Sequence, residues 1–139
     1  MISSKQRVLL ICTHNSARSQ IAEGFLNALY GDRYEGYSAG IEPRMVNPYA
    51  IKVMAEYGID ISKHRSKSVE EFRAMHFDYV VTVCSQAREV CPFFTGGKVL
   101  HKSFEDPSTF KGSTDRIMKE TRRIRDEIRD WIGRIFGRE

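Results

Sequence analysis

The sequence predicts an α/β fold: a single three-layer domain with a four-stranded parallel sheet and helices on both of its faces. Three observations support this prediction. Apolar segments of strand length alternate with segments of helical periodicity, the first segment is continuously apolar, and no low-complexity linker interrupts the pattern. A continuous apolar run is typical of a strand buried on both faces of a parallel sheet. We therefore assign residues 1–139 to one domain.

The predicted strands and helices alternate along the chain. The strands are residues 8–11, 37–40, 77–84 and 98–101. Residues that would cap or end the helices between and after them are Gly31, Asn47 with Pro48, Ser68 and Ser113. Ser68 would open a short helix over 68–75, with Glu71 completing a capping box. Right-handed crossovers would then place all strand carboxyl ends on one edge, where ligands bind in such sheets.

The charge pattern favours a small anionic substrate over nucleic acid. The net charge of +4 comes from 22 basic and 18 acidic residues, which are spread along the chain. The first apolar run is shorter than a signal peptide core, of about 7–15 residues, or a membrane span, of about 20. We therefore expect a cytoplasmic protein that engages neither nucleic acid nor a membrane. We also expect a monomer, although nothing in the sequence determines the oligomeric state.

The three cysteines, Cys12, Cys84 and Cys91, are an odd number and too few for a disulfide scaffold. In a reducing compartment such cysteines are catalytic, redox-active or metal-binding more often than structural. Cys12 and Cys84 each end a predicted strand, so they should meet at the same sheet edge. The structural alternative is a packed strand residue at 84 and an incidental thiol at 91.

The first strand runs into a cysteine, five further residues, an arginine and a serine. In full the segment is Cys12, Thr13, His14, Asn15, Ser16, Ala17, Arg18 and Ser19. Five residues can wrap their N–H groups around a tetrahedral oxyanion, and the following helix adds its positive N-terminus. The planar fork of Arg18 can hold two oxygens of that anion. The same field stabilises a thiolate, so the segment predicts a cysteine nucleophile.

Other polar residues of this chain suit that chemistry. Ser19 is placed to hydrogen-bond the Cys12 thiolate, and Asn15 to fix the loop backbone. A leaving oxygen needs a proton donor, which Asp106 can supply because Pro107 holds it in extended geometry. His14 either faces solvent or takes part in catalysis.

These motifs together resemble the low-molecular-weight tyrosine phosphatase superfamily over essentially the whole chain, which implies a flavodoxin-like fold. Within it, "CTHNSARSQIAEG", "YSAGIEP", "VNPYAI", "GIDISKHRS" and "VVTVCSQAREVCP" resemble the thioredoxin-coupled arsenate reductases. The phosphatases share the first loop but lack the cysteine pair. The resemblance implies arsenate reduction with no bound cofactor, with electrons supplied by reduced thioredoxin.

The spacing of Cys84 and Cys91 fits a thiol relay. On a helix, seven residues separate two thiols by about 10 Å, whereas a disulfide needs Cα atoms within about 7 Å. A bridge would unwind such a helix and remain easy to reduce. The resemblance implies the same relay: Cys12 attacks arsenate, Cys84 attacks Cys12, and Cys91 attacks Cys84.

The chain departs from the family pattern at three positions. Ala17 stands where many relatives carry a further cysteine, and His14 where glycine is commoner. Some relatives bind potassium with residues matching Asn15, Glu23, Ser38 and an aspartate whose place Lys67 takes here. Because Lys67 brings its own cation, we predict no specific potassium site and no other bound metal.

Two other functions compete with arsenate reduction. A tyrosine phosphatase could use the same loop and acid, although only Phe110 lies near Asp106 in sequence to hold a phenyl ring. A thiol sensor could bind arsenite or a metal through Cys84 and Cys91. His101 and the other histidines stand at no recognisable zinc-ligand spacing, which argues against the sensor.

Overall fold

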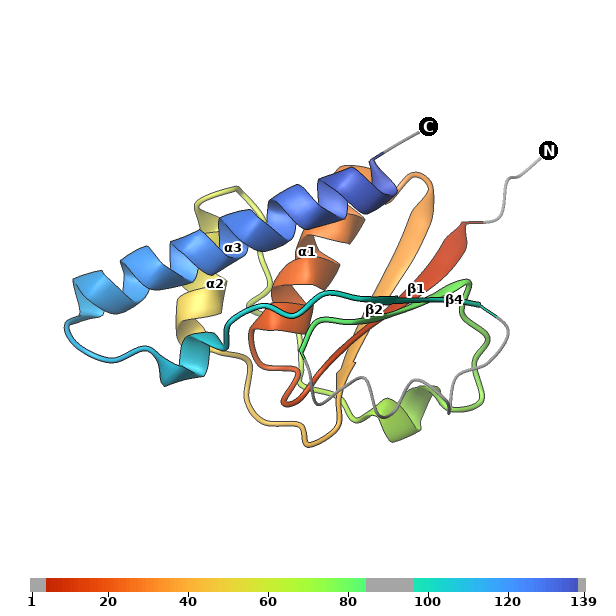
Figure 1. Cartoon of the computed structure of the whole chain (residues 1–139), viewed down its shortest axis with the longest axis horizontal. Coiled ribbons are helices and arrows are strands. Elements are labelled where there is room, and N and C mark those ends of the chain that lie inside the picture. The colour runs from red at the N-terminus through yellow and green to blue at the C-terminus, as the bar shows by residue number, and fades with distance from the viewer. Residues whose placement is uncertain (1–4, 85–96, 138–139) are drawn as a thin grey trace.

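A computed structural model describes residues 5–84 and 97–137, so Cys91 lies outside the described residues. Four parallel strands form one sheet in the order β2-β1-β3-β4 (Figure 1). The strands are β1 (Gln6–Cys12), β2 (Tyr34–Gly40), β3 (Tyr79–Thr82) and β4 (Lys98–His101). The helices are α1 (Arg18–Tyr30), α2 (Pro48–Ala55) and α3 (Thr114–Phe136), with short 3-10 turns η1 (Val69–Phe72) and η3 (Pro107–Thr109). The predicted α/β class and parallel sheet are confirmed.

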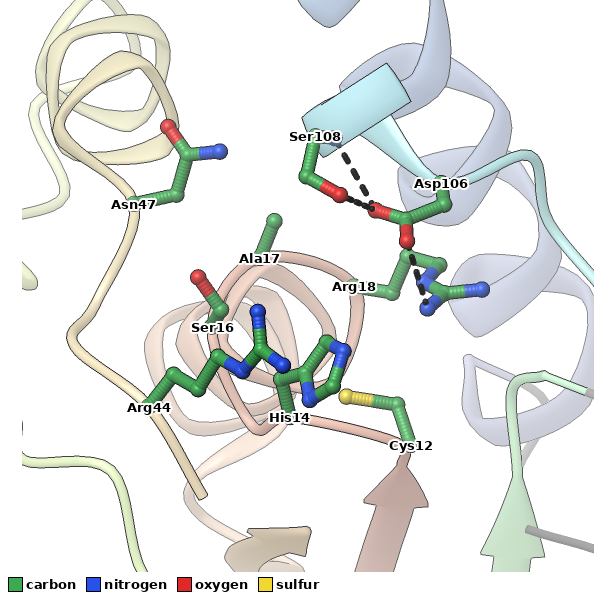
Figure 2. A pocket seen from close by; sticks show the side chains of 9 residues that line it. All are labelled: Cys12, His14, Ser16, Ala17, Arg18, Arg44, Asn47, Asp106 and Ser108. Carbon is green, nitrogen blue, oxygen red and sulfur yellow. Dashed lines mark hydrogen bonds and ion pairs between the residues drawn. The ribbon is translucent and has the colours of Figure 1, made fainter. Parts of the chain in front are cut away.

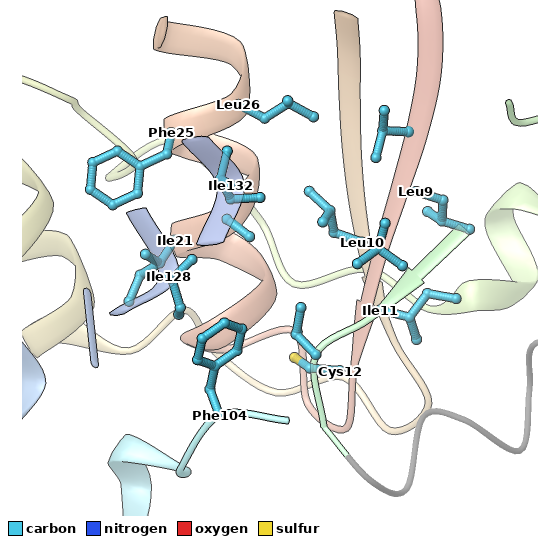
Figure 3. Packing of buried hydrophobic residues seen from close by; sticks show 14 of the residues in the cluster. Leu9, Leu10, Ile11, Cys12, Ile21, Phe25, Leu26, Phe104, Ile128 and Ile132 are labelled. Carbon is cyan, nitrogen blue, oxygen red and sulfur yellow. The ribbon is translucent and has the colours of Figure 1, made fainter. Parts of the chain in front are cut away.

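The strand register separates the two faces of the sheet. Leu10 lies beside Ser38 and Val81, and the Ser38 hydroxyl donates to Glu23 of α1. This face packs against α1 and α3, and Leu10 belongs to the same hydrophobic cluster as Ile128 and Ile132 of α3 (Figure 3). Removing these side chains from water supplies the main drive for folding.

The opposite face carries a cluster of aromatic rings. Tyr37, paired with Leu9, has its ring centroid 5.8 Å from that of Phe72 in η1 and 5.7 Å from that of Phe77. Edge-to-face packing of this kind stabilises rings beyond the area they bury. Among the described residues, α1 and α3 cover one face of the sheet and the 3-10 turn η1 lies on the other (Figure 1).

The helix ends follow the capping signals except at Ser68. Asn47 accepts from the N–H groups of Tyr49 and Ala50, and Ser113 accepts from that of Arg116. Ser68, however, accepts from the N–H of Glu70, and only a single 3-10 turn forms. The predicted helix over 68–75 is wrong in type and length, because the N–H groups of Glu71, Arg73 and Met75 bond to carbonyls three residues earlier rather than four.

None of the helices in the described parts of the chain is long and apolar enough to cross a membrane.

Candidate active site

Cys12, the last residue of β1, and Cys84, two residues after β3, lie at the same carboxyl edge of the sheet, as the sequence predicts. β1 pairs with β3, so the residues that follow the two strands lie side by side. The hydroxyl of Thr13 lies 3.2 Å from the Cys84 sulfur. Both thiols are buried and free. The structure therefore places a second thiol against the loop that carries Cys12.

The loop after Cys12 turns its carbonyl groups outward. They accept N–H groups from residues 41–47, which wrap around the loop after β2. The bonds run from Ile41 to Cys12 (3.2 Å), Glu42 to Thr13 (2.8 Å), Arg44 to His14 (3.0 Å) and Asn47 to Ser16 (2.9 Å). In a trans peptide the C=O and N–H groups point in opposite directions. Outward carbonyls therefore turn N–H groups inward, which creates an anion-binding concavity.

Asn15 connects this loop to the sulfur of Cys12. Its φ is +49°, a left-handed conformation that asparagine tolerates better than most residues. Its Oδ1 accepts the backbone N–H of Lys67 at 2.8 Å, which fixes the orientation of the amide. Its Nδ2 therefore donates to Ser19 Oγ at 2.8 Å.

The Ser19 hydroxyl hydrogen is then available to the Cys12 sulfur, 2.9 Å away. The backbone N–H of Asn15 also donates to that sulfur, at 3.2 Å. Two hydrogen-bond donors are thus aimed at the Cys12 sulfur. The structure thus brings Ser19 and Asn15 to the places that their proposed roles require.

A cavity of about 70 Å³ opens above the Cys12 sulfur. It has room for more than one water molecule, and hence for a small tetrahedral anion. Figure 2 shows its lining side chains, which are Cys12, His14, Ser16, Ala17, Arg18, Arg44, Asn47, Asp106 and Ser108. The loop and the predicted acid thus face one small space.

Arg18 and Asp106 form an ion pair in this cavity. The buried guanidinium donates to the carbonyl of Phe104 at 3.2 Å and lies 3.5 Å from Asp106 Oδ2. Asp106 Oδ1 accepts the N–H and hydroxyl of Ser108 at 2.9 and 2.8 Å. Burial raises the pKa of Asp106, but the Ser108 bonds and the positive charges of Arg18 and His14 outweigh it and lower that pKa. In the free site Asp106 is therefore a carboxylate.

Several residues of the site carry no clear signal in the sequence. Gln20, fully buried, donates through Nε2 to Asn15 Oδ1 at 3.0 Å. Ser66 donates to the carbonyls of His14 and Asn15 at 2.7 and 2.9 Å. Arg44 lines the cavity from the segment after β2. Of these three residues, Gln20 carries the strongest sequence signal for a site residue, because it is a polar residue beside the apolar positions of α1.

Lys67 lies beside Glu23, where its own positive charge was expected to exclude a potassium ion. Its Nζ donates to the carbonyl of Arg65 at 2.9 Å and lies 3.9 Å from Glu23 Oε1. Burial lowers the pKa of Lys67, and the Glu23 charge works against that shift. Ser38 donates to the same carboxylate. A protein cation thus stands beside Glu23.

An apolar groove of about 300 Å³ adjoins the cavity. The two share Ser16, Asn47 and Ser108. Its apolar lining is formed by Met45, Val46, Pro48, Tyr49, Pro107, Phe110 and Ile117. The sequence pointed only to Phe110 here, because Met45 and Tyr49 come from the distant segment after β2.

A cysteine positioned by a strand end and surrounded by inward N–H groups defines a protein that performs thiol chemistry on oxyanions. The low molecular weight phosphotyrosine protein phosphatase family matches residues 7–136, and the chain belongs to that family.

The relatives carry two different names. The "Arsenate reductase" of Halalkalibacterium halodurans is 42% identical over 126 residues, which cover 90% of this chain and 91% of that protein. A solved structure described as an arsenate reductase in the phosphate binding state superposes with a TM-score of 0.77 at 28% identity, covering 95% and 97% of the two chains. A low molecular weight protein tyrosine phosphatase from T. tengcongensis gives 0.80 at 28% identity, covering 96% and 99%.

Proposed function

We propose that this protein reduces arsenate to arsenite by a relay of Cys12, Cys84 and Cys91 that thioredoxin regenerates. The observation that supports it most is the buried, free Cys84 thiol, 3.2 Å from the hydroxyl of Thr13 in the Cys12 loop. A phosphatase needs only the first thiol. The arsenate reductase of H. halodurans, one of several relatives of that name, is 42% identical to this chain.

The first step forms an arsenic–sulfur bond. The Cys12 thiolate attacks arsenate while Arg18 and the loop N–H groups hold its oxygens. One arsenic–oxygen bond breaks, and the departing oxygen takes a proton to leave as water. The product is a Cys12–arsenate adduct in which arsenic is still pentavalent.

Asp106 supplies that proton. The pKa of its carboxyl is low in the free site, so it must first gain a proton. A bound oxyanion draws the Arg18 charge to itself and adds negative charge beside Asp106, and both effects favour the protonated acid. Binding of substrate thereby prepares the proton donor.

The second step transfers the electrons. Cys84 attacks the Cys12 sulfur, the sulfur–arsenic bond breaks with its electron pair staying on arsenic, and arsenite leaves. Two thiols are oxidised to a Cys12–Cys84 disulfide as arsenic gains two electrons. Cys91 then attacks Cys84 and frees Cys12, and a dithiol of thioredoxin reduces the Cys84–Cys91 bond. No flavin or metal takes part.

Arsenate-dependent NADPH oxidation with thioredoxin and thioredoxin reductase tests this proposal. We expect turnover in the wild type and none in Cys12→Ser, Cys84→Ser or Cys91→Ser. Hydrolysis of an aryl phosphate provides the control, because it requires Cys12 and leaves the loop's integrity measurable in the other two variants. Multiple turnovers by Cys91→Ser at the wild-type rate would refute the relay.

Phosphomonoester hydrolysis is the second candidate function. The groove lined by Tyr49 and Phe110 beside the cavity favours it, because two aromatic side chains can hold a phenyl ring. Aryl-phosphate hydrolysis that requires Cys12 and Asp106, in a protein without arsenate turnover, would make phosphatase the better assignment.

A further inference from the structure

We propose that the His14 side chain is a specificity-determining residue that selects oxyanions bearing a hydrogen, such as arsenate and phosphate, over sulfate. The inference deepens the proposed function and rests on its oxyanion site. It concerns the side chain of His14, which lines the cavity and which no step of the proposed reaction uses.

The His14 ring is held in a defined orientation at the cavity mouth. Its Nδ1 lies 2.9 Å from the carbonyl oxygen of Glu42. A carbonyl oxygen can only accept, so Nδ1 carries a hydrogen. The backbone carbonyl of His14 is bound as well, by Arg44 and Ser66. Both the ring and its backbone are therefore tied to their surroundings.

The remaining ring nitrogen faces the anion site. His14 lines the cavity, and Figure 2 shows its second nitrogen turned toward the side where Asp106 lies. The positive charge of a protonated His14 reaches Asp106 closely enough to lower the pKa of that carboxyl. An anion held by Arg18 would lie between His14 on one wall of the cavity and Asp106 on the other.

A neutral imidazole with hydrogen on Nδ1 presents only a lone pair at Nε2. That lone pair accepts from an oxyanion that carries an O–H, as hydrogen arsenate and hydrogen phosphate do. Sulfate has no hydrogen to offer, and its oxygen would meet the lone pair directly. The Nε2 lone pair therefore discriminates in two ways: it attracts an anion that carries an O–H, and it repels an anion that offers only bare oxygens.

Arg44 provides a matched contrast on the same wall. Its guanidinium lines the cavity, is largely exposed and lies 3.2 Å from Glu42 Oε1. A cation attracts every anion and does not distinguish an O–H from a bare oxygen. Arg44 should therefore add affinity without selectivity.

Calorimetric titration of the reduced protein with phosphate and with sulfate, at pH 8, tests the proposal. This pH lies above the range in which imidazoles ordinarily titrate. We expect His14→Gly to lower the ratio of phosphate to sulfate affinity about fivefold, the equivalent of one neutral hydrogen bond. Arg44→Gln should weaken both anions by about threefold and leave the ratio unchanged.

His14→Ala must reproduce the ratio of His14→Gly, because both lack the ring nitrogen. Unequal ratios in these two variants would trace the effect to the loop backbone and overturn the proposal. Equal weakening of both anions in His14→Gly, or no change, would overturn it as well. Phosphate and sulfate are not reduced in this experiment. The ratio of their affinities can therefore be interpreted even if the protein does not reduce arsenate.

Discussion

The loop that carries Cys12 and the segment that carries Asp106 face each other across one cavity, but they are held differently. The loop is bound from outside, by residues 41–47, Gln20, Ser66 and the backbone of Lys67. Asp106 is bound mainly within its own turn, by Ser108, and to the loop by one ion pair of 3.5 Å. The nucleophile is therefore preorganised, whereas the acid can change its partner when an anion arrives.

The largest expected effect is the loss of arsenate turnover when Asp106, the acid that can change its partner, is replaced. Asp106→Asn should lower arsenate turnover by about 10³-fold, because the amide cannot donate the proton that the departing oxygen needs. The amide oxygen can still accept from Ser108, so the free energy of unfolding should change by less than about 1 kcal/mol. Steady-state kinetics and urea denaturation measure the two quantities. A turnover loss below about tenfold would remove Asp106 from the acid role.

On the preorganised side, the main expected effect is on stability. Asn15→Ala removes the bonds to Lys67 and Ser19 and places alanine at positive φ, so we expect a loss of about 3 kcal/mol. Asn15→Gly lacks the same bonds but tolerates the backbone, and should recover about 1 kcal/mol of that loss. Urea denaturation compares them. Equal losses would show that the left-handed conformation costs little here.

A smaller effect concerns the thiolate. Ser19→Ala removes one of two donors to the Cys12 sulfur, so alkylation by iodoacetamide at pH 7 should slow by about tenfold. Ser19→Thr keeps the hydroxyl and should restore most of the rate. Mass spectrometry confines the measurement to Cys12. An unchanged rate in Ser19→Ala would place the thiolate's stabilisation entirely on the backbone.

The Asp106 segment also predicts a pH dependence of stability. The pKa of Asp106 is lower in the folded chain than its ordinary value of 3.8. The ionised carboxylate therefore stabilises the fold above that value, and this contribution is lost as pH falls through the lower, folded pKa. The stability difference between wild type and Asp106→Asn should shrink below about pH 4. Denaturation curves at pH 3 and pH 6 check it, and a difference that grows toward acid would contradict it.

The smallest expected effect is the response to potassium. Lys67 places its ammonium beside Glu23, so a second cation there would be repelled. We expect turnover rates in KCl and NaCl of equal ionic strength to agree. Lys67→Met, which keeps the apolar stem without the charge, is the matched variant. Selective stimulation of the wild type by potassium would contradict this prediction.

Sequence reasoning could predict the elements whose causes are local. Apolar runs define the strands, and their order places Cys12 and Cys84 on one edge. It could not predict Ser66 or Arg44, because their contacts with the loop join segments far apart in the chain. It also overestimated the helix at Ser68, because a cap residue marks where a helix begins and does not decide whether the backbone bonds that follow span three residues or four.

The segment after β2 supports the nucleophile loop through its main chain. Four of its N–H groups hold four loop carbonyls, and the backbone is the same whatever side chains it carries. Positions such as Glu42, Arg44 and Met45 can therefore vary over evolution while the loop keeps its shape. Side-chain changes in the segment after β2 can therefore alter the substrate preference of the cavity while the loop that positions the nucleophile keeps its shape.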